Sequence, residues 1–248
     1  MSLFRLFYRF CVMFHFKQFS VEDSSSPMKV GTDAVLLGAW TPSLNCADIS
    51  ILDIGTGCGV IALMLAQRIS NANIQAIDID SGACYNAKEN FSNSIWRNRL
   101  NIHECSIQSF CESTNSKFNI IVSNPPFFEE SLKSNKTKRN LARHTDSLPF
   151  QTMIKSVDYL MNENGMFACI LPFNEGNKFI DLAKTYNLFC TKKMLVANKP
   201  SQTINRILFC LSRKEVSLID TSTLFIRDED NSYSKEYLNL TKDFYTFI

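Results

Sequence analysis

The sequence has few of the features that mark metal-binding or membrane-spanning proteins. Its nine cysteines form no CxxC pair, and its three histidines do not stand at metal-ligand spacing. This pattern speaks against a metal site and favours reduced cysteines in the core. The apolar stretch 1–16 is too short to span a bilayer and has no small-residue cleavage site. A net charge of +2 is too small to identify a nucleic-acid partner, so any such partner must be inferred from where the charges lie.

Low-complexity tracts and internal repeats are also absent, and the composition is that of a globular protein. Hydrophobic residues make up 45% of the chain and charged residues 20%. The length of 248 residues fits one substantial core. We therefore predict a single domain over 13–248. Residues 1–12 are expected to be an extension of it, either a disordered arm, a leader-like tail or the product of an upstream start. A monomeric cytoplasmic protein without metal or membrane partners is expected.

From residue 49 onward, short apolar runs alternate with stretches of helical period. This alternation predicts an α/β fold with a parallel sheet and crossover helices. The expected helices lie at 59–69, 81–94, 149–162 and 174–186. The expected strands lie at 49–54, 74–78, 99–104, 118–123, 165–171, 188–196 and 205–213.

The last two predicted strands are separated only by NKPSQTIN, which is too short for a crossover helix. They should therefore pair antiparallel. The chain after Val216 is expected to add one further edge element to the sheet. A seven-stranded, mostly parallel sheet with a terminal antiparallel hairpin resembles the Rossmann-like class I methyltransferases.

Three glycines, Gly55, Gly57 and Gly59, stand between the first of these strands and the following helix. Glycines there allow a tight turn and let a ligand approach main-chain N–H groups at a helix N-terminus. A merely tight turn is the simpler alternative. Counted from Gly57, the string also fits the dinucleotide fingerprint GxGxxA. Counted from Asp53, it reads DxGxGxG and resembles motif I of S-adenosylmethionine (SAM) methyltransferases.

An acid follows at the tip of the next strand, where Asp78 lies 19 residues after Gly59. A carboxylate in this position can accept hydrogen bonds from both ribose hydroxyls, which NAD and SAM sites equally require. Asp80 is expected instead to cap the following helix. At the end of the third strand the sequence offers Glu104, Cys105 and Ser106 but no clear Asp. Ser106 is a weaker candidate for a contact near the adenine of the cofactor.

The fourth strand is followed by Asn124, Pro125, Pro126 and Phe127. Tandem prolines fix the backbone and remove two donors, so the Pro125 carbonyl is free to accept. Together with the Asn124 side chain it offers two acceptors for the two N–H bonds of an exocyclic amine or amide, and the aromatic ring can stack on a planar substrate. Hydride transfer has no use for such a set. The string resembles motif IV of the amino-methyltransferases, (N/D/S)PP(Y/F/W).

Four strings in order resemble one family. They are FKQF and MKVGTDAVLLGAW before the glycine loop, LDIGTGCGVIALMLAQR, SNPPFF, and ARHT. The chain from 13 to 248 resembles the tRNA1(Val) adenine-N6-methyltransferase family, which uses SAM to methylate the adenosine next to the anticodon, position 37. The resemblance implies base contacts from 124–127. Together with the motif residues described above, it implies a set of SAM contacts. These are Lys29, Gly31, Thr32, Asp33, Asp53, Gly55, Gly57, Gly59, Asp78, Ser106 and Asn124.

Other readings of the same motifs remain open. Phe127 stands where many adenine-N6 enzymes have tyrosine, and guanine-N2 enzymes of RNA also carry phenylalanine there. A protein glutamine-amide methyltransferase shares the second motif, but usually has an additional N-terminal helical domain. A non-catalytic RNA-binding module is the remaining alternative.

A run of positive charge follows the Asn-Pro-Pro-Phe string. It is predicted to contact RNA phosphates, although charged runs are often only solvated surface. Arg143 and His144, which lie shortly before SLPF, a predicted helix start, could instead order the loop. The run consists of Lys133, Lys136, Lys138, Arg139, Arg143 and His144.

Overall fold

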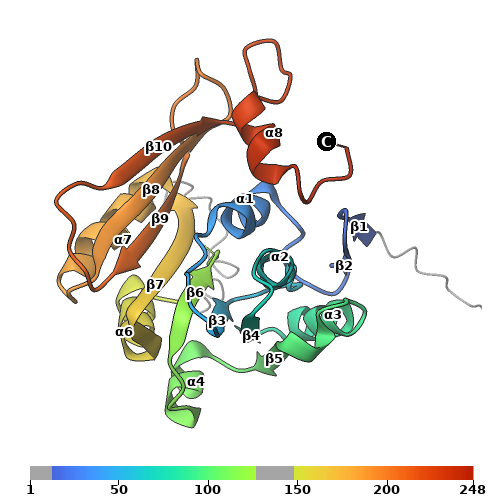
Figure 1. Ribbon diagram of the computed structural model, residues 1–248, viewed down its shortest axis with the longest axis vertical. Coiled ribbons are helices and arrows are strands. Elements are labelled where there is room, and N and C mark those ends of the chain that lie inside the picture. The colour runs from blue at the N-terminus through green and yellow to red at the C-terminus, as the bar shows by residue number, and fades with distance from the viewer. Residues whose placement is uncertain (1–12, 127–147, 248) are drawn as a thin grey trace, which may run out of the picture.

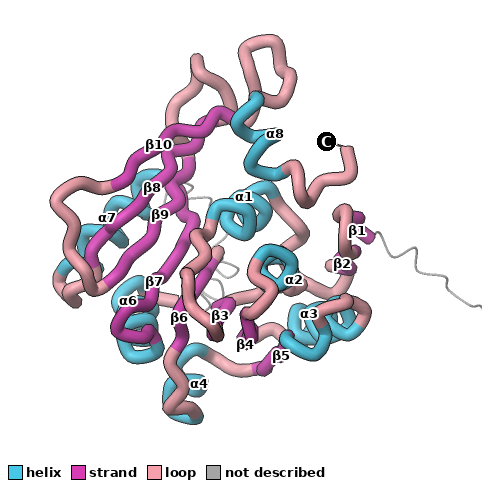
Figure 2. The backbone as a smooth tube through the Cα atoms, in the orientation of Figure 1, coloured by secondary structure: helices cyan, strands magenta, loops and turns pink. Residues whose placement is uncertain are grey.

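The computed structural model describes residues 13–126 and 148–247, drawn as ribbon in Figure 1. Helices and strands alternate along most of this length, as the tube in Figure 2 shows. The strands are β1 (Met13–His15), β2 (Ser20–Glu22), β3 (Ile49–Ile54), β4 (Ala72–Asp78), β5 (Leu100–Glu104), β6 (Phe118–Ser123), β7 (Met161–Pro172), β8 (Phe189–Ala197), β9 (Arg206–Ser212) and β10 (Asp220–Phe225). The helices are α1 (Thr32–Trp40), α2 (Val60–Arg68), α3 (Ser81–Ser92), the 3-10 turn η1 (Arg97–Arg99), α4 (Ile107–Ser113), α6 (Phe150–Leu160), α7 (Phe173–Lys184) and α8 (Lys235–Thr241).

The main sheet has the strand order β10-β8-β9-β7-β6-β3-β4-β5. All neighbouring pairs are parallel except those that involve β9, which runs antiparallel to β7 and β8. The chain adds β4 and β5 on one side of β3, and later returns to the other side of β3 with β6. Ligands of open α/β sheets bind at the carboxyl ends of the strands at such a reversal.

Helices cover both faces of the sheet (Figure 1). One core joins α1, α2 and α3 to the sheet through side chains such as Ile51 and Val122. The other joins α4, α6 and α7 through their strand neighbours, such as Leu52 and Ile121. This alternation follows from the two-residue period of a strand, which points successive side chains to opposite faces. Both faces of the sheet are therefore largely apolar, and most residues of β3 and β6 are buried apolar residues.

The fold predicted from the sequence is confirmed in its main features. Strands form in all seven predicted ranges, and β8 and β9 pair antiparallel as expected. The further edge element predicted after Val216 is β10, which pairs with β8 at the rim of the sheet. Helix α4 was not predicted, because only Ile107 and Phe110 are buried in its seven residues and they give no sustained helical period.

The first and last described segments meet on one side of the sheet. The isolated bridge between Phe16 and Tyr245 joins them, and the Phe16 ring stacks on Phe19 with centroids 4.5 Å apart. Among the described helices, none has the length and apolar character needed to cross a membrane. Of the described cysteines, five are buried as predicted, namely Cys58, Cys84, Cys169, Cys190 and Cys210.

Candidate functional site

The strand register brings the three predicted motifs to one edge of the sheet. Ile54 at the end of β3 pairs with Ile77 in β4 on one side and with Ser123 in β6 on the other. The next residues along these strands are Gly55, Asp78 and Asn124. The glycine loop, the acid predicted to bind ribose and the asparagine predicted to bind an amine are therefore neighbours at the carboxyl ends of β3, β4 and β6.

The glycine loop uses the backbone freedom that only glycine offers without strain. Gly55, Gly57 and Gly59 have φ values of 68°, 58° and 83°, in the left-handed region. A Cβ atom at Gly55 would meet nothing within 4 Å, so this face of the loop is open to a ligand. At Gly59 a Cβ atom would lie 2.5 Å from the Phe91 ring, so this glycine lets α2 pack closely on α3.

Asp78 is tied to the glycine loop. Its carboxylate accepts the N–H of Gly57 at 2.8 Å and the N–H of Asp80 at 3.0 Å. Each carboxylate oxygen accepts about two hydrogen bonds, so acceptor capacity remains for two ribose hydroxyls. The cap predicted for Asp80 is confirmed, since its side chain accepts the N–H of Ala83 at 2.7 Å.

Asp53 is fully buried beneath the loop. The Thr56 hydroxyl donates to its Oδ2 atom at 2.6 Å, whereas Oδ1 has no hydrogen-bond partner among the described residues. Burial raises the pKa of this carboxyl from its ordinary 3.8 to about 7, and the nearby charge of Asp78 adds to the effect. A buried acid with one unpaired oxygen is suited to receive a donor or a positive charge from a ligand.

Asn124 also presents an unpaired acceptor. Its Oδ1 atom is buried and finds no hydrogen-bond partner in the described part of the chain. The preceding Ser123 hydroxyl donates to the Ile54 carbonyl at 2.9 Å and fixes the end of β6 against β3. Pro125 is buried and Pro126 exposed. Phe127, the last residue of the predicted set, lies outside the described residues.

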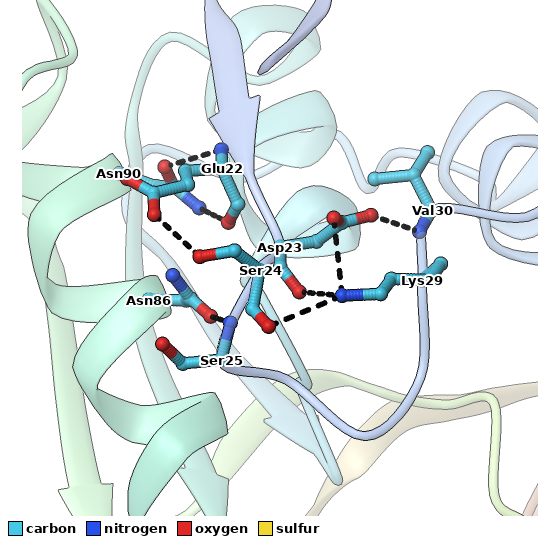
Figure 3. A network of polar contacts seen from close by, with 8 residues as sticks. All are labelled: Glu22, Asp23, Ser24, Ser25, Lys29, Val30, Asn86 and Asn90. Atoms are coloured by element: carbon cyan, nitrogen blue, oxygen red, sulfur yellow. Dashed lines mark hydrogen bonds and ion pairs between the residues drawn. The ribbon is translucent and has the colours of Figure 1, made fainter. Parts of the chain in front are cut away.

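The connection between β2 and α1, residues 23–31, carries two of the predicted cofactor contacts. The ammonium group of Lys29 donates a hydrogen bond to the Asp23 carbonyl at 2.6 Å, and its Nζ atom lies 3.6 Å from the Asp23 carboxylate (Figure 3). This carboxylate also accepts the N–H of Val30 at 2.9 Å. The Lys29 side chain therefore holds the connection together in this structure. Gly31 follows as the N-cap of α1.

The first turn of α1 contains the other two predicted contacts of this segment. Thr32 is exposed. The carboxylate of Asp33 forms an ion pair with the Arg206 guanidinium at 2.8 Å. Because Arg206 pairs in register with Pro172 at the end of β7, this ion pair lies at the same edge of the sheet as the glycine loop.

Two further residues lie near this edge of the sheet. The hydroxyl of Ser106 caps α4 by accepting the N–H of Ser109 at 3.1 Å, so it has a structural partner of its own. Ile79, between Asp78 at the end of β4 and the α3 cap Asp80, is 63% exposed. Its apolar surface beside Asp78 is suited to a flat ring, a feature that the sequence analysis missed because Ile79 continues an apolar strand pattern.

The predicted RNA-contacting residues Lys133, Lys136, Lys138, Arg139, Arg143 and His144 lie outside the described residues. Their assignment therefore rests on the sequence.

The chain is similar to a methyltransferase family in sequence and to several solved structures in fold. Residues 30–148 match the methyltransferase small domain family. A protein of Flavobacterium johnsoniae named tRNA1(Val) (adenine(37)-N6)-methyltransferase is 46% identical over 94% of this chain and 99% of its own length. A predicted O-methyltransferase of Agrobacterium tumefaciens has the same fold, with a TM-score of 0.67 and 16% identity over 86% of this chain and 96% of that one.

A second similar solved structure is that of P. horikoshii TYW2 in complex with MeSAdo. It has a TM-score of 0.56 and 10% identity, over 82% of this chain and 71% of its own. At this identity the likeness shows the fold alone.

Proposed function

Since the chain belongs to the tRNA1(Val) (adenine(37)-N6)-methyltransferase family, we infer that it methylates N6 of an adenosine in tRNA with SAM as methyl donor. The observation that carries this inference at the site is the unpaired Asn124 Oδ1 atom beside the open glycine loop. The two features are neighbours because Ile54 and Ser123 pair in register. An amine held by Asn124 would thus lie next to the cofactor.

The cofactor fits the groups present at the edge of the sheet. SAM supplies an electrophilic methyl group on a sulfonium when it is bound. Asp78 has acceptor capacity for the ribose hydroxyls, and the buried Oδ1 atom of Asp53 can pair with the ammonium group of the amino acid part. Gly55 leaves room for close approach to the backbone. These residues bind and orient the donor.

The substrate residues act by positioning and electrostatics. The lone pair of adenine N6 is delocalised into the ring, so the amine is a poor nucleophile. Hydrogen bonds from its two N–H groups to Asn124 Oδ1 and the Pro125 carbonyl favour positive charge on nitrogen during the transfer. The proton can leave afterwards, and no side-chain base is required. We assign stacking on the base to Phe127.

One reaction tests both which base is methylated and whether tRNA1(Val) is the substrate. The protein is incubated with methyl-labelled SAM and a tRNA1(Val) transcript, and the nucleosides are analysed by mass spectrometry. We expect N6-methyladenosine, and no product from a transcript with guanosine at position 37. N2-methylguanosine in the product would assign the chain to the guanine-N2 alternative, and a labelled protein without labelled RNA would favour glutamine methylation.

The basic run is proposed to bind tRNA phosphates. Replacing Lys136, Lys138 and Arg139 with alanine should weaken tRNA binding and lower the slope of log K against log salt by up to about three, since each lost phosphate contact removes about one counterion. Binding is measured by fluorescence anisotropy at KCl concentrations from about 50 to about 300 mM, over which the affinity of a phosphate-binding protein changes strongly. An unchanged slope would assign these residues to the solvated surface.

A matched control removes the same charge elsewhere. It replaces the exposed residues Lys88, Lys214 and Lys235 with alanine. Because net charge changes equally in both triple variants, a general electrostatic effect would lower both slopes alike, and only a local contact separates them.

We further propose that 13–248 acts as one methyltransferase domain and as a cytoplasmic monomer. The two apolar cores on either side of one sheet support a single folding unit. Light scattering after size exclusion measures the mass directly, and a value near twice the 28.3 kDa of one chain would contradict the monomer.

A further inference from the structure

Two buried asparagines of α3 hold the β2–α1 connection in place. Asn86 Oδ1 accepts the N–H of Ser25 at 2.9 Å. One turn further, Asn90 Oδ1 accepts the N–H of Glu22 at 2.9 Å, and its Nδ2 atom donates to the Glu22 carbonyl at 2.8 Å (Figure 3). The same Nδ2 atom also donates to the Cys58 carbonyl at 2.8 Å. Residues four apart lie on the same face of a helix. The face of α3 that meets the connection is therefore polar and specific.

The connection lies against both α3 and the glycine loop. At Gly82, in the first turn of α3, a Cβ atom would lie 2.4 Å from the Ser25 carbonyl oxygen, so only glycine permits this approach. At Gly57 the position of a Cβ atom is 3.8 Å from the Ser26 hydroxyl. The contact of Asn90 with Cys58 ties the same helix to the loop. Ser26 is thus fixed beside the glycine loop.

Ser26 is buried without using its hydroxyl. Its side chain is only 4% exposed, and its Oγ atom has no hydrogen-bond partner among residues 13–126 and 148–247. A buried hydroxyl without a partner is destabilising. Two other buried oxygens at this edge of the sheet are also unpaired, Asp53 Oδ1 and Asn124 Oδ1, and both have been assigned to ligands above. A ligand would likewise explain why the Ser26 Oγ atom is buried without a partner in the described residues.

We propose that the Ser26 hydroxyl donates a hydrogen bond to the carboxylate of the cofactor's amino acid part, and that Asn86 and Asn90 are positioning residues for it. The inference rests on the proposed function. A carboxylate suits this place because the N-terminus of α2, which follows the glycine loop, favours negative charge. The acids Asp53 and Asp78 are instead suited to the ammonium and hydroxyl groups. The β2–α1 connection would then be one wall of the cofactor site.

Two ligands separate the parts of the cofactor. S-adenosylhomocysteine has both the adenosyl and the amino acid part, whereas 5′-methylthioadenosine has only the former. Isothermal titration of the free protein with each ligand needs no RNA and no turnover. Ser26→Ala should weaken S-adenosylhomocysteine binding by about tenfold, the usual size for a hydrogen bond to a charged group. It should leave 5′-methylthioadenosine binding unchanged.

Stability controls separate a binding role from a structural one. Because Ser26→Ala removes an unpaired buried hydroxyl, the Tm of the free variant should be no lower than that of the wild type. Ser92→Ala removes an exposed hydroxyl at the end of α3 and should alter neither ligand's affinity. Equal losses for both ligands, or no loss for either, would overturn the assignment of Ser26.

The positioning role is tested by a double-mutant cycle. Asn86→Ala removes the acceptor of the Ser25 N–H and should weaken S-adenosylhomocysteine binding more than 5′-methylthioadenosine binding. If Asn86 acts through Ser26, combining it with Ser26→Ala costs no more affinity than the larger single change. Tyr85→Ala, at a neighbouring residue that is 58% exposed, is the control for the helix. Additive losses would overturn the positioning role.

The outcomes also distinguish this inference from the proposed function. If the wild type binds neither ligand, the proposed function fails. If the wild type binds both and Ser26→Ala binds S-adenosylhomocysteine as tightly, only the inference about Ser26 fails.

Discussion

Replacement of Asn124 with alanine is expected to lower kcat by about a hundredfold to a thousandfold, the usual size when one preorganised polar group at a reacting centre is removed. The reason is that its buried Oδ1 atom is the side-chain acceptor available to the amine at the end of β6. Affinity for S-adenosylhomocysteine should change little, because the partner of this acceptor is the substrate. Single-turnover methylation and isothermal titration measure the two quantities separately.

A conservative variant sharpens this test. Asn124→Asp keeps an acceptor at the same place and should retain more activity than Asn124→Ala, as expected from a motif that admits both residues. Asn101→Ala, at an exposed position of β5, is the matched control. If Asn124→Ala lost cofactor affinity and methyl transfer to a similar extent, Asn124 would be a structural residue of the β6 end.

Replacement of Asp53 with asparagine is expected to change how stability depends on pH. Burial raises the pKa of this carboxyl in the folded chain from 3.8 to about 7. The folded state therefore binds the proton more tightly than the unfolded state does. Stability from this group is fully present below about pH 4 and is lost as the pH rises towards 7, by about 4 kcal/mol in total. Asparagine has nearly the same shape and does not titrate.

Asparagine at position 53 should therefore remove the loss of stability that the wild type shows at high pH. At pH 8 the free Asp53→Asn protein should be more stable than the wild type by up to about 4 kcal/mol, and near pH 4 the difference should almost vanish. Urea unfolding at both pH values measures it, with the exposed Asp48→Asn as control. Cofactor binding should weaken, since the variant has no charge for the ammonium group. Equal stabilities of the wild type and Asp53→Asn at pH 8 would show that burial does not destabilise the charged form of Asp53.

Much of the site could be predicted from the sequence because its main parts follow strand ends. The residues Gly55, Asp78 and Asn124 each come directly after an apolar run, and the ends of parallel strands meet at one edge. The cap at Asp80 could be predicted as well, since a short acidic side chain before a helix has few other roles. These inferences need only local patterns.

The remainder depends on contacts between distant segments. Ser26 lies in a run of three serines, and nothing in the run indicates which hydroxyl becomes buried without a partner. Asn86 and Asn90 stand among Ala83, Ala87 and Phe91, which form a buried apolar stripe of α3. Two asparagines four residues apart beside such a stripe were a signal that this helix face has a polar partner. The identity of that partner required the structure.

The order of strands also bears on how the protein is made. Ser123 and its partner Ile54 are 69 residues apart, yet they stand side by side at the centre of the site. The entropy of closing such a long loop must be met before the strands can pair. During synthesis, the edge at which Gly55 and Asn124 are neighbours can therefore form only after β6 has left the ribosome. Once the site has formed, bound SAM stabilises the folded chain by mass action, so free SAM at 100 times its Kd should add about 2.7 kcal/mol of stability.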